Sequence, residues 1–380
     1  MMLKKIKKIV CLNSEIIQHL VSAAFFKSDI SSFDECYQYL NTIHKDVRSG
    51  SLRVKQPKNE GAYRYDVSII MTTYNRAHLV ENCIESILSN VSKDSKYKVE
   101  YIFVNDGSKD NTEEVLEKYR HCPDVTVINQ ENGGLSKARN TGIDASSAKY
   151  LLFVDDDDLL IEGSIEKLLD VSRAGDYDII EGAMVTVSKD GTQRKVRVAQ
   201  VGEIQHPLGI LKGFAWGKLL RKTIFDKIIF PEKYWFEDSI NSALIYGDHI
   251  KAYMIADPVY KYFATQGSIT SSHNNPKNLD SLYISMQLLK DRKELGLPFR
   301  QENYEYFLRM TDLTYQRTRK FDTKVRYCIF KITQYLQQEY YSGFSTEKTG
   351  YLQQTEEALL EDNFQKYVRA CEFNILSKFS

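Results

Sequence analysis

The chain has 380 residues, of which 42% are hydrophobic, so it can bury a full core as one large domain with additions or as two domains. Lys plus Arg and Asp plus Glu number 51 each, and this zero formal charge excludes a global basic bias, so we expect no nucleic-acid partner. The six cysteines lack C-x-x-C or other metal-ligand spacing, which indicates reduced thiols in a cytoplasmic protein and no zinc site.

Residues 1–64 are predicted to form a helical extension followed by a linker. Apolar residues recur at mixed helical spacings from Ile6 to Leu20, and the polar stretch Ser49–Arg64 contains Pro57 and Gly61. The early lysines resemble the start of a signal peptide, but polar residues interrupt the apolar stretch too soon, so we do not expect secretion. No run of about 20 apolar residues predicts a membrane span. Contact of the basic start with anionic lipid at the inner face of the membrane is left open.

Residues 65–275 change to short apolar runs, rich in β-forming residues, that alternate with helical patterns. The runs are Val67–Met71, Val99–Val104, Val125–Ile128 and Tyr150–Val154, and the helical patterns include Ala77–Leu88 and Thr112–Tyr119. This alternation predicts an α/β fold with a mostly parallel central sheet. Further strands are predicted at Ile179–Val187 and Lys195–Val201.

Residues 276–380 are predicted to be helices rich in Tyr, Leu and Lys. Their aromatic residues, among them Tyr304, Phe307 and Tyr315, indicate a packing surface between helices rather than a cofactor site. The two helical extensions could also support a homo-oligomer.

Polar residues follow four of the predicted strands, and ligands of open α/β sheets bind beyond the carboxyl ends of strands. The first strand is followed by Thr72-Thr73-Tyr74-Asn75-Arg76, which supplies hydroxyls, an aromatic face and a cation. Such a set can stack a nucleobase and meet a phosphate. Asn75 is also expected to cap a helix that begins at Arg76.

The second and third strand exits carry a carboxylate and a glycine turn. Asp106 follows the second strand in the turn Asn105–Ser108, where an ionised carboxylate can accept hydrogen bonds from a nucleobase; ordinary turn chemistry is the alternative. The third exit has Gly133 and Gly134 leading into a helix with Lys137 and Arg139 in its first turns. Backbone amides at a helix start, together with cations, suit a phosphate group.

The fourth strand ends in four consecutive aspartates, Asp155 to Asp158. Like charges this close are costly unless a cation lies among them, and hard oxygen ligands favour Mg²⁺ or Mn²⁺. If the backbone stays extended for two more residues, Asp155 and Asp157 point the same way and form a D-x-D pair. A solvated acidic loop is the alternative.

This ordered set of four strand exits resembles the family 2 glycosyltransferases with the nucleotide-diphospho-sugar (GT-A) fold. The resemblance covers about Val67 to Ser272 and is strongest up to Leu160. It implies an inverting transfer of a sugar from a UDP-sugar to a hydroxyl of a glycan, a lipid-linked glycan or a protein-linked glycan, with Mn²⁺ or Mg²⁺ as cofactor. Similar enzymes build bacterial surface polysaccharides and glycoconjugates.

The resemblance also implies roles for individual residues. Those implied to bind the nucleotide-sugar are Thr72, Tyr74, Asn75, Arg76, Asp106, Gly134, Arg139, Asp155 and Asp156. Asp106 matches the carboxylate that reads uracil, and Arg139 matches a helix cation near the diphosphate. Asp155 and Asp157 match the metal pair, although the uninterrupted aspartate run leaves the register ambiguous by one position.

Downstream, Trp235–Ser239 resembles the family's E-D motif, which makes Asp238 the candidate catalytic base and places Glu237 on the acceptor side. An inverting transfer needs a carboxylate to take the proton of the acceptor hydroxyl. The alternative is an acidic N-terminus for a helix at Ile240–Tyr246.

Two further segments belong to the resemblance. Ala215–Leu220 resembles the segment under the acceptor site, where Trp216 can stack on a sugar and Lys218 lies on the acceptor side; a core tryptophan is the alternative. In the later loop, Phe263 and Thr265 replace an Arg or His that many relatives carry, which removes a phosphate or metal contact.

Other function classes fit less well. A nucleotidyltransferase needs an early glycine-rich loop with a basic residue, and none lies between Ile69 and His78. A dehydrogenase is disfavoured because no G-x-G-x-x-G follows a strand. A noncatalytic sugar-nucleotide-binding or scaffold subunit is the remaining alternative, against which the aspartate pair and Glu237-Asp238 argue.

Overall fold

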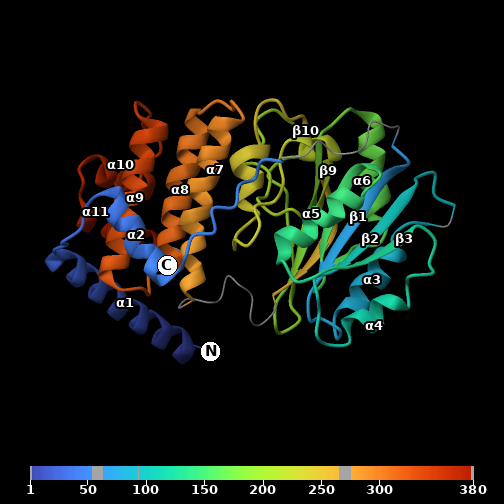
Figure 1. Ribbon diagram of the computed structural model, residues 1–380, viewed down its shortest axis with the longest axis horizontal. Coiled ribbons are helices and arrows are strands. Elements are labelled where there is room, and N and C mark those ends of the chain that lie inside the picture. Colours follow the sequence, from blue (N-terminus) through green and yellow to red (C-terminus); the bar gives the residue numbers. More distant parts are fainter. Residues whose placement is uncertain (1, 54–62, 93, 265–274, 378–380) are drawn as a thin grey trace. The chain divides into compact units, whose positions relative to one another are not determined.

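The computed structural model of the chain describes residues 2–53, 63–92, 94–264 and 275–377 (Figure 1). Its contacts divide the chain into two compact units. Met1–Arg48 and Ile269–Ser380 form a helical unit, and Ser49–Ser268 form a unit built on a β-sheet. The helical unit therefore combines both ends of the chain.

The sheet unit has a mixed β-sheet with the strand order β3-β2-β1-β4-β9-β6-β10-β5. The strands on this path are β1 (Tyr65–Thr73), β2 (Val99–Asn105), β3 (Val125–Asn129), β4 (Ala148–Asp155), β5 (Leu159–Leu160), β6 (Ile179–Val187), β9 (Lys218–Arg221) and β10 (Ala252–Phe263). β7 (Gln193–Val196) pairs with β6, and β8 (Gly202–Ile204) pairs with β10. The helices between the strands are α3 (Val80–Leu88), α4 (Thr112–Glu117), α5 (Leu135–Ala145) and α6 (Ser164–Ala174), with short turns of helix η1 (Lys222–Asp226) and η2 (Asn241–Ile245).

The strands β1 to β4 pair in parallel, as the sequence predicts, whereas β9 runs antiparallel between β4 and β6. The register pairs Thr73 with Asn105, and Thr72 with Asp155. The carboxyl ends of β1, β2 and β4 therefore meet at one edge of the sheet, and the polar residues that follow them gather there.

The core of the sheet unit explains the unbroken apolar runs in its central strands. Val67, Ile69 and Ile70 on β1 are all buried, because helices cover both faces of a parallel sheet. The helix α5 approaches β1 closely at Gly142, where an added Cβ would lie 2.4 Å from the Cγ2 atom of Ile70. A glycine is needed at this position for α5 to reach the sheet.

Two local predictions are wrong. Asn75 does not cap a helix beginning at Arg76, because α3 starts at Val80 and Asn75 has a left-handed φ of 55°. The strand predicted at Lys195–Val201 is displaced, because β7 pairs with β6 across a hairpin that turns at Gly191 (φ 79°), and the chain enters β8 only at Gly202.

The helical unit contains α1 (Met2–Phe25), α2 (Phe33–Ile43), η4 (Pro276–Leu279), α7 (Asp280–Glu294), α8 (Gln301–Thr318), α9 (Thr323–Tyr341), α10 (Tyr351–Leu360) and α11 (Phe364–Ser377). Its aromatic residues pack between helices as predicted, with Tyr304 and Tyr315 at most 1% exposed. Glu372 is fully buried, accepts hydrogen bonds from Tyr315 (2.6 Å) and Arg319 (3.0 Å), and its Oε1 atom lies 2.5 Å from His19 Nδ1. Within the described residues, no helix is long and apolar enough to cross a membrane.

Candidate active site

The loops that follow β1 and β2 are joined by hydrogen bonds at the carboxyl edge of the sheet. The amide of Asn75 donates to Ser108 Oγ (2.9 Å), and Asn75 Oδ1 accepts from the amide of Lys109 (2.7 Å). The amide of Arg76 donates to Thr112 Oγ1 (3.0 Å). Asn75 therefore fixes the shape of this loop pair instead of starting a helix.

The loop pair leaves one aromatic ring at the surface. Thr72, still within β1, is buried, whereas Tyr74 is 43% exposed. The side chain of Arg76 reaches toward the aspartate run, with its Nε atom 3.9 Å from Asp156 Oδ1. An exposed ring beside a cation is an arrangement that can accept a nucleobase and a phosphate.

Asp106 holds the glycine turn that precedes α5. It is 3% exposed, and its Oδ1 atom accepts from Gln130 Nε2 (2.6 Å) and from the amide of Gly133 (2.9 Å). Its Oδ2 atom accepts from the amide of Gly134 (2.8 Å), where φ is 86°. The structure thus brings Asp106 and Gly134 together, and both oxygens of the carboxylate already have donors within the chain.

Arg139 is buried and binds three carboxylates, of which Glu237 is buried while Asp155 and Asp238 are partly exposed. Its side chain is 2% exposed, its Nη1 atom donates to Glu237 Oε1 (2.8 Å) and Asp238 Oδ1 (3.1 Å), and its Nη2 atom donates to Asp155 Oδ1 (3.0 Å). The guanidinium also lies 5.4 Å from the ring centroid of Phe230, within the range of a cation–π contact. This arginine therefore joins the end of β4 to the E-D motif.

The sequence does not predict this cluster as a unit, although it contains a signal for the buried arginine. Arg139 shares the buried face of α5 with Gly142 and Ile143, three and four residues later, and that spacing indicates an arginine directed into the core. An arginine on a buried helix face requires acidic partners. The sequence does not say which carboxylates they are, since Glu237 and Asp238 come from a distant segment, just after Phe236 (φ 67°).

The electrostatics of the cluster are strongly shifted. Burial acts to lower the pKa of Arg139, but Asp238, Asp155 and Glu237 raise it above its usual value, so the guanidinium stays charged. Burial raises the pKa of Asp238 to about 7, with Glu237 adding to the rise and Arg139 opposing it. A carboxylate that titrates near neutral pH is suited to general-base catalysis.

The aspartate run is a turn and not a continued strand. β4 ends at Asp155, and the amide of Asp158 donates to the carbonyl oxygen of Asp155 (3.1 Å). The condition for Asp155 and Asp157 to share a strand face is therefore not met. Burial raises the pKa of Asp156 to about 7 and that of Asp158 to about 8, and neighbouring carboxylates add to both rises.

The carboxylates here fit a divalent ion whose coordination a diphosphate completes. In the part of the chain that the structure describes, no group of three or more His, Cys, Asp or Glu side chains is gathered to hold a metal alone. Mg²⁺ typically takes only one or two carboxylates and adds waters and substrate phosphates. Asp158 is 1% exposed, and its Oδ2 atom has no hydrogen-bond partner among the described residues, so one buried oxygen of this acidic turn is left without a hydrogen bond.

Nearby residues of β10 support the same turn. Tyr260 Oη accepts a hydrogen bond from the amide of Asp155 (3.0 Å), and the amide of Phe263 donates to Asp158 Oδ1 (2.8 Å). The sequence offered no signal for the role of Tyr260, because a tyrosine is ordinary in a strand. Thr265, the other position at which the loop departs from relatives, lies outside the described residues.

Two residues predicted on the acceptor side are part of the interior. Trp216 is 6% exposed and stacks with Phe214 (4.5 Å between centroids), Tyr260 (4.4 Å) and Tyr262 (5.6 Å). Lys218 is fully buried. Trp216 thus has little surface left for a sugar, and its position agrees with the core alternative.

The amine of Lys218 fixes the loop that precedes β9. Its Nζ atom donates to Glu181 Oε2 (2.5 Å), to the carbonyl oxygen of Lys212 (2.6 Å) and to Tyr246 Oη (2.9 Å). Glu237, the third residue predicted on the acceptor side, is buried in the Arg139 cluster. Neither Lys218 nor Glu237 therefore lies at the surface.

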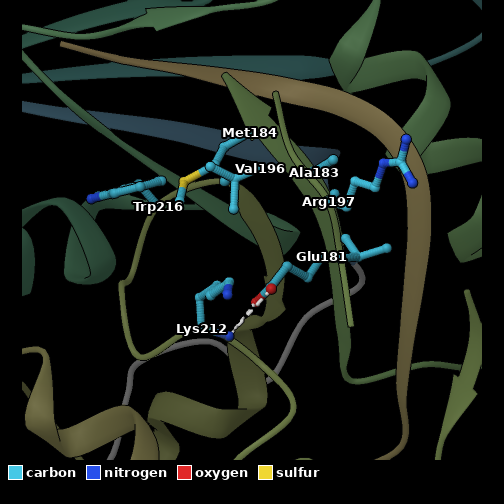
Figure 2. Close-up of a pocket in the computed structure, with 10 residues that line it drawn as sticks. Glu181, Ala183, Met184, Val196, Arg197, Lys212 and Trp216 are labelled. Carbon is cyan, nitrogen blue, oxygen red and sulfur yellow. Dashed lines mark hydrogen bonds between the residues drawn. The ribbon is translucent and has the colours of Figure 1, made fainter. Parts of the chain in front are cut away.

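A small, open surface pocket lies beside Trp216 (Figure 2). It is lined by Glu181, Gly182, Ala183, Met184, Val196, Arg197, Val198, Lys212, Trp216 and Gly217. The carboxylate of Glu181 accepts from the backbone amide of Lys212 (3.1 and 3.2 Å), as the dashed lines in Figure 2 show. The pocket combines apolar walls with the two exposed cations Arg197 and Lys212.

Comparisons with known proteins agree with this architecture. Residues 68–229 match the model of glycosyl transferase family 2. Relatives include the uncharacterized glycosyltransferase EpsJ of Bacillus subtilis, 30% identical over 55% of this chain and 64% of EpsJ. Another is TarP of Staphylococcus aureus, a poly(ribitol-phosphate) beta-N-acetylglucosaminyltransferase, 31% identical over 42% of this chain and 50% of TarP. The matched segment thus spans less than two thirds of the length of either relative.

Among solved structures, S. aureus TarS 1-349 in complex with UDP-GlcNAc superposes with a TM-score of 0.66 at 18% identity, over 82% of this chain and 92% of that one. This likeness shows the fold, and the predicted GT-A architecture with additional C-terminal helices is confirmed. The segment that matches the family model, residues 68–229, identifies a glycosyl transferase family 2 domain within the chain.

Proposed function

We propose that the chain is an inverting, divalent-metal-dependent glycosyltransferase that moves a hexosyl or N-acetylhexosaminyl group from a UDP-sugar to a glycan hydroxyl. The observation that carries the proposal is Arg139, which binds the candidate base Asp238 and the candidate metal ligand Asp155 at once. The structural neighbour TarS is named in complex with UDP-GlcNAc, and the relative TarP is named a poly(ribitol-phosphate) beta-N-acetylglucosaminyltransferase, which supports a UDP-N-acetylhexosamine donor and a polymer acceptor. The proposed glycosyltransferase domain is residues 65–275.

The donor is proposed to lie along the carboxyl edge of β1, β2 and β4. Tyr74 stacks on the uracil, and Arg76 and Asp156 contact the ribose or diphosphate. The carboxylate of Asp106 accepts from the uracil imide, sharing oxygens that also hold Gly133 and Gly134. Thr72, Asn75 and Gly134 act here through the shape of the backbone around the nucleotide.

The chemistry is proposed to be a direct displacement at the sugar carbon. Asp238 Oδ takes the proton of the acceptor hydroxyl as its oxygen attacks, and the bond to the UDP oxygen breaks. Arg139 holds Asp238 in place and keeps the carboxylates around it together. A Mg²⁺ or Mn²⁺ ion is proposed to be held by Asp155 and Asp157 across the turn rather than on one strand face, and it would neutralise the charge on the departing diphosphate.

The chain's location and partners are part of the same proposal. We propose a cytoplasmic enzyme, either free or at the inner face of the membrane. Self-association through the helical unit is proposed as well.

UDP binding is expected to depend on a divalent ion, because the diphosphate would otherwise face the aspartate turn. Asp157→Asn should weaken UDP binding in the presence of Mn²⁺ by about 100-fold or more, since even indirect metal supports cost about 10- to 100-fold. Calorimetric titration of UDP with and without Mn²⁺ measures this effect. The control is Asp190→Asn, in the exposed hairpin turn between β6 and β7. Equal UDP affinity with and without Mn²⁺ would remove the metal from the proposal.

Release of UDP from UDP-sugars distinguishes an enzyme from a noncatalytic subunit. With a panel of UDP-sugars and Mn²⁺, the enzyme should release UDP slowly without an acceptor and faster with one. A chain that binds UDP tightly and never releases it from any UDP-sugar would support the scaffold alternative.

The transfer rate is expected to rise with pH through about 7. The pKa of Asp238 is raised to about 7, so the carboxylate is mostly protonated, and inactive as a base, below that pH. At saturating substrates kcat should be about 10-fold lower at pH 6 than at pH 8, following the deprotonated fraction. The measurement is kcat between pH 5 and 9, with UDP affinity followed in parallel to exclude a donor effect. A flat profile over this range would contradict the assignment of the base.

A further inference from the structure

Phe214 presents an aromatic face to solvent beside the candidate active site. Its side chain is 40% exposed, although its ring stacks at 4.5 Å and 5° on the buried Trp216. Trp216 in turn stacks on Tyr260, whose hydroxyl binds the amide of Asp155. The exposed ring is thus the outer member of an aromatic stack whose inner ring, Tyr260 of β10, contacts the backbone at the end of β4.

The backbone on the N-terminal side of Phe214 is held by buried polar groups. The carboxylate of Glu181 accepts a hydrogen bond from the backbone amide of Lys212. The backbone carbonyl oxygen of Lys212 accepts hydrogen bonds from Lys218 Nζ and from Tyr246 Oη. Figure 2 shows the carboxylate of Glu181 directed at this backbone amide. Burying the ion pair between Lys218 and Glu181 costs desolvation free energy, which is unusual for the support of an ordinary surface loop. These bonds fix the backbone of Lys212, two residues before Phe214, and a binding group benefits from such support.

Two hydrogen bonds connect this loop to the candidate base. The amide of Asn241 donates to the carbonyl oxygen of Asp238 (3.0 Å), and its side-chain Nδ2 donates to the carbonyl oxygen of Gly213 (2.9 Å). Gly213 also packs against Ser242, since an added Cβ would lie 3.6 Å from Ser242 Oγ. The residue next to Phe214 is therefore fixed to the segment that carries Asp238.

We propose that Phe214 is the stacking platform for the acceptor sugar, so that one C–H face of a pyranose ring lies on the exposed phenyl face while a hydroxyl of that sugar is deprotonated by Asp238. This inference rests on the proposed function, because it assigns the acceptor subsite of the same reaction. A sugar ring fits this position because a pyranose has an apolar face of C–H groups and hydroxyl groups at its edge. The loop is also hydrogen-bonded, through Asn241, to the segment of Asp238, whose proposed role is to deprotonate a hydroxyl. Lys218 is a positioning residue for this platform, and Trp216 is its support.

The test measures sugar binding at Phe214 directly. Saturation-transfer NMR is recorded with methyl β-glucoside, methyl β-galactoside and methyl N-acetyl-β-glucosaminide, with and without UDP and Mn²⁺. Phe214→Leu keeps an apolar cover over Trp216 but removes the aromatic face, and Phe214→Tyr keeps the face. The matched control is Phe373→Leu, since Phe373 is 43% exposed on α11 in the helical unit. Thermal melting confirms that each variant is folded.

At least one glycoside should bind equally well to the wild type, Phe214→Tyr and Phe373→Leu. The same glycoside should bind Phe214→Leu about 3- to 10-fold more weakly, which is the scale of an aromatic stacking contact. UDP affinity with Mn²⁺ should be the same in all four proteins. Equal glycoside binding by Phe214→Leu, or no binding of any glycoside by the wild type, would overturn the platform. Loss of UDP binding by the wild type would instead overturn the donor site of the proposed function, and the glycoside result would still decide the role of Phe214.

Discussion

Replacing Arg139 by methionine is expected to lower the free energy of unfolding by about 3–5 kcal/mol, the usual cost of removing one partner from a buried ion cluster. Methionine fills similar space, but Asp155, Glu237 and Asp238 would then face one another without the cation that now binds all three. Denaturant titration at pH 8 measures the loss. The control is Arg120→Met, because Arg120 and its partner Glu117 are both exposed and a surface pair contributes at most about 1 kcal/mol.

The pH dependence of this loss has a definite sign. Without Arg139 the pKa of Asp238 rises further, so the variant gains protons on folding and is most stable at acid pH. The deficit relative to wild type should therefore be smaller at pH 5 than at pH 8. Arg139→Lys should recover only part of the stability, because an ammonium lacks the planar set of donors that now spans the carboxylates. A variant within about 1 kcal/mol of wild type at both pH values would show that the cluster contributes no net stability.

Replacing Asp238 by asparagine is expected to slow sugar transfer by about 100-fold or more while UDP affinity with Mn²⁺ stays close to that of wild type. Asparagine preserves the shape and can still meet Arg139 through its carbonyl oxygen, but it cannot take a proton. Transfer rate and UDP affinity are measured on the same preparation, with Asp190→Asn as the control for an exposed aspartate. A normal transfer rate would exclude Asp238 as the base. Loss of the fold or of UDP binding would support the alternative in which the acid serves the helical turn that follows.

The sequence was sufficient to predict the parallel strands β1 to β4 and the polar residues at their carboxyl ends, but not the strands β9 and β10. Apolar runs such as Val67–Met71 and Tyr150–Val154 become adjacent parallel strands, and their register places Thr72 opposite Asp155. Strand periodicity and the polar residues at strand ends are local patterns, so they can be recognised in a single sequence.

Side-chain partners were harder to predict, because they depend on contacts between distant segments. Arg139 was expected to meet phosphate, but its helix face packs toward the core, where Glu237 and Asp238 arrive from 98 and 99 residues away. Lys218 is predicted on the acceptor side, yet β9 lies between β4 and β6, where its side chain is enclosed. Helix and strand patterns do not specify which segment fills such a position.

The helical unit has a consequence for how the chain folds as it is synthesised. Its first helices belong to the N-terminal end, but their partners come last: Phe33 at the start of α2 meets Tyr335 on α9 (4.5 Å between ring centroids), and His19 on α1 meets Glu372 on α11. Translation proceeds at roughly 5–20 residues per second, so α1 and α2 wait on the order of tens of seconds for those partners. The sheet unit, Ser49–Ser268, is complete before that point and can fold first. During that interval the apolar faces of α1 and α2 are exposed in the nascent chain, and this is the stage at which aggregation or chaperone binding is most expected.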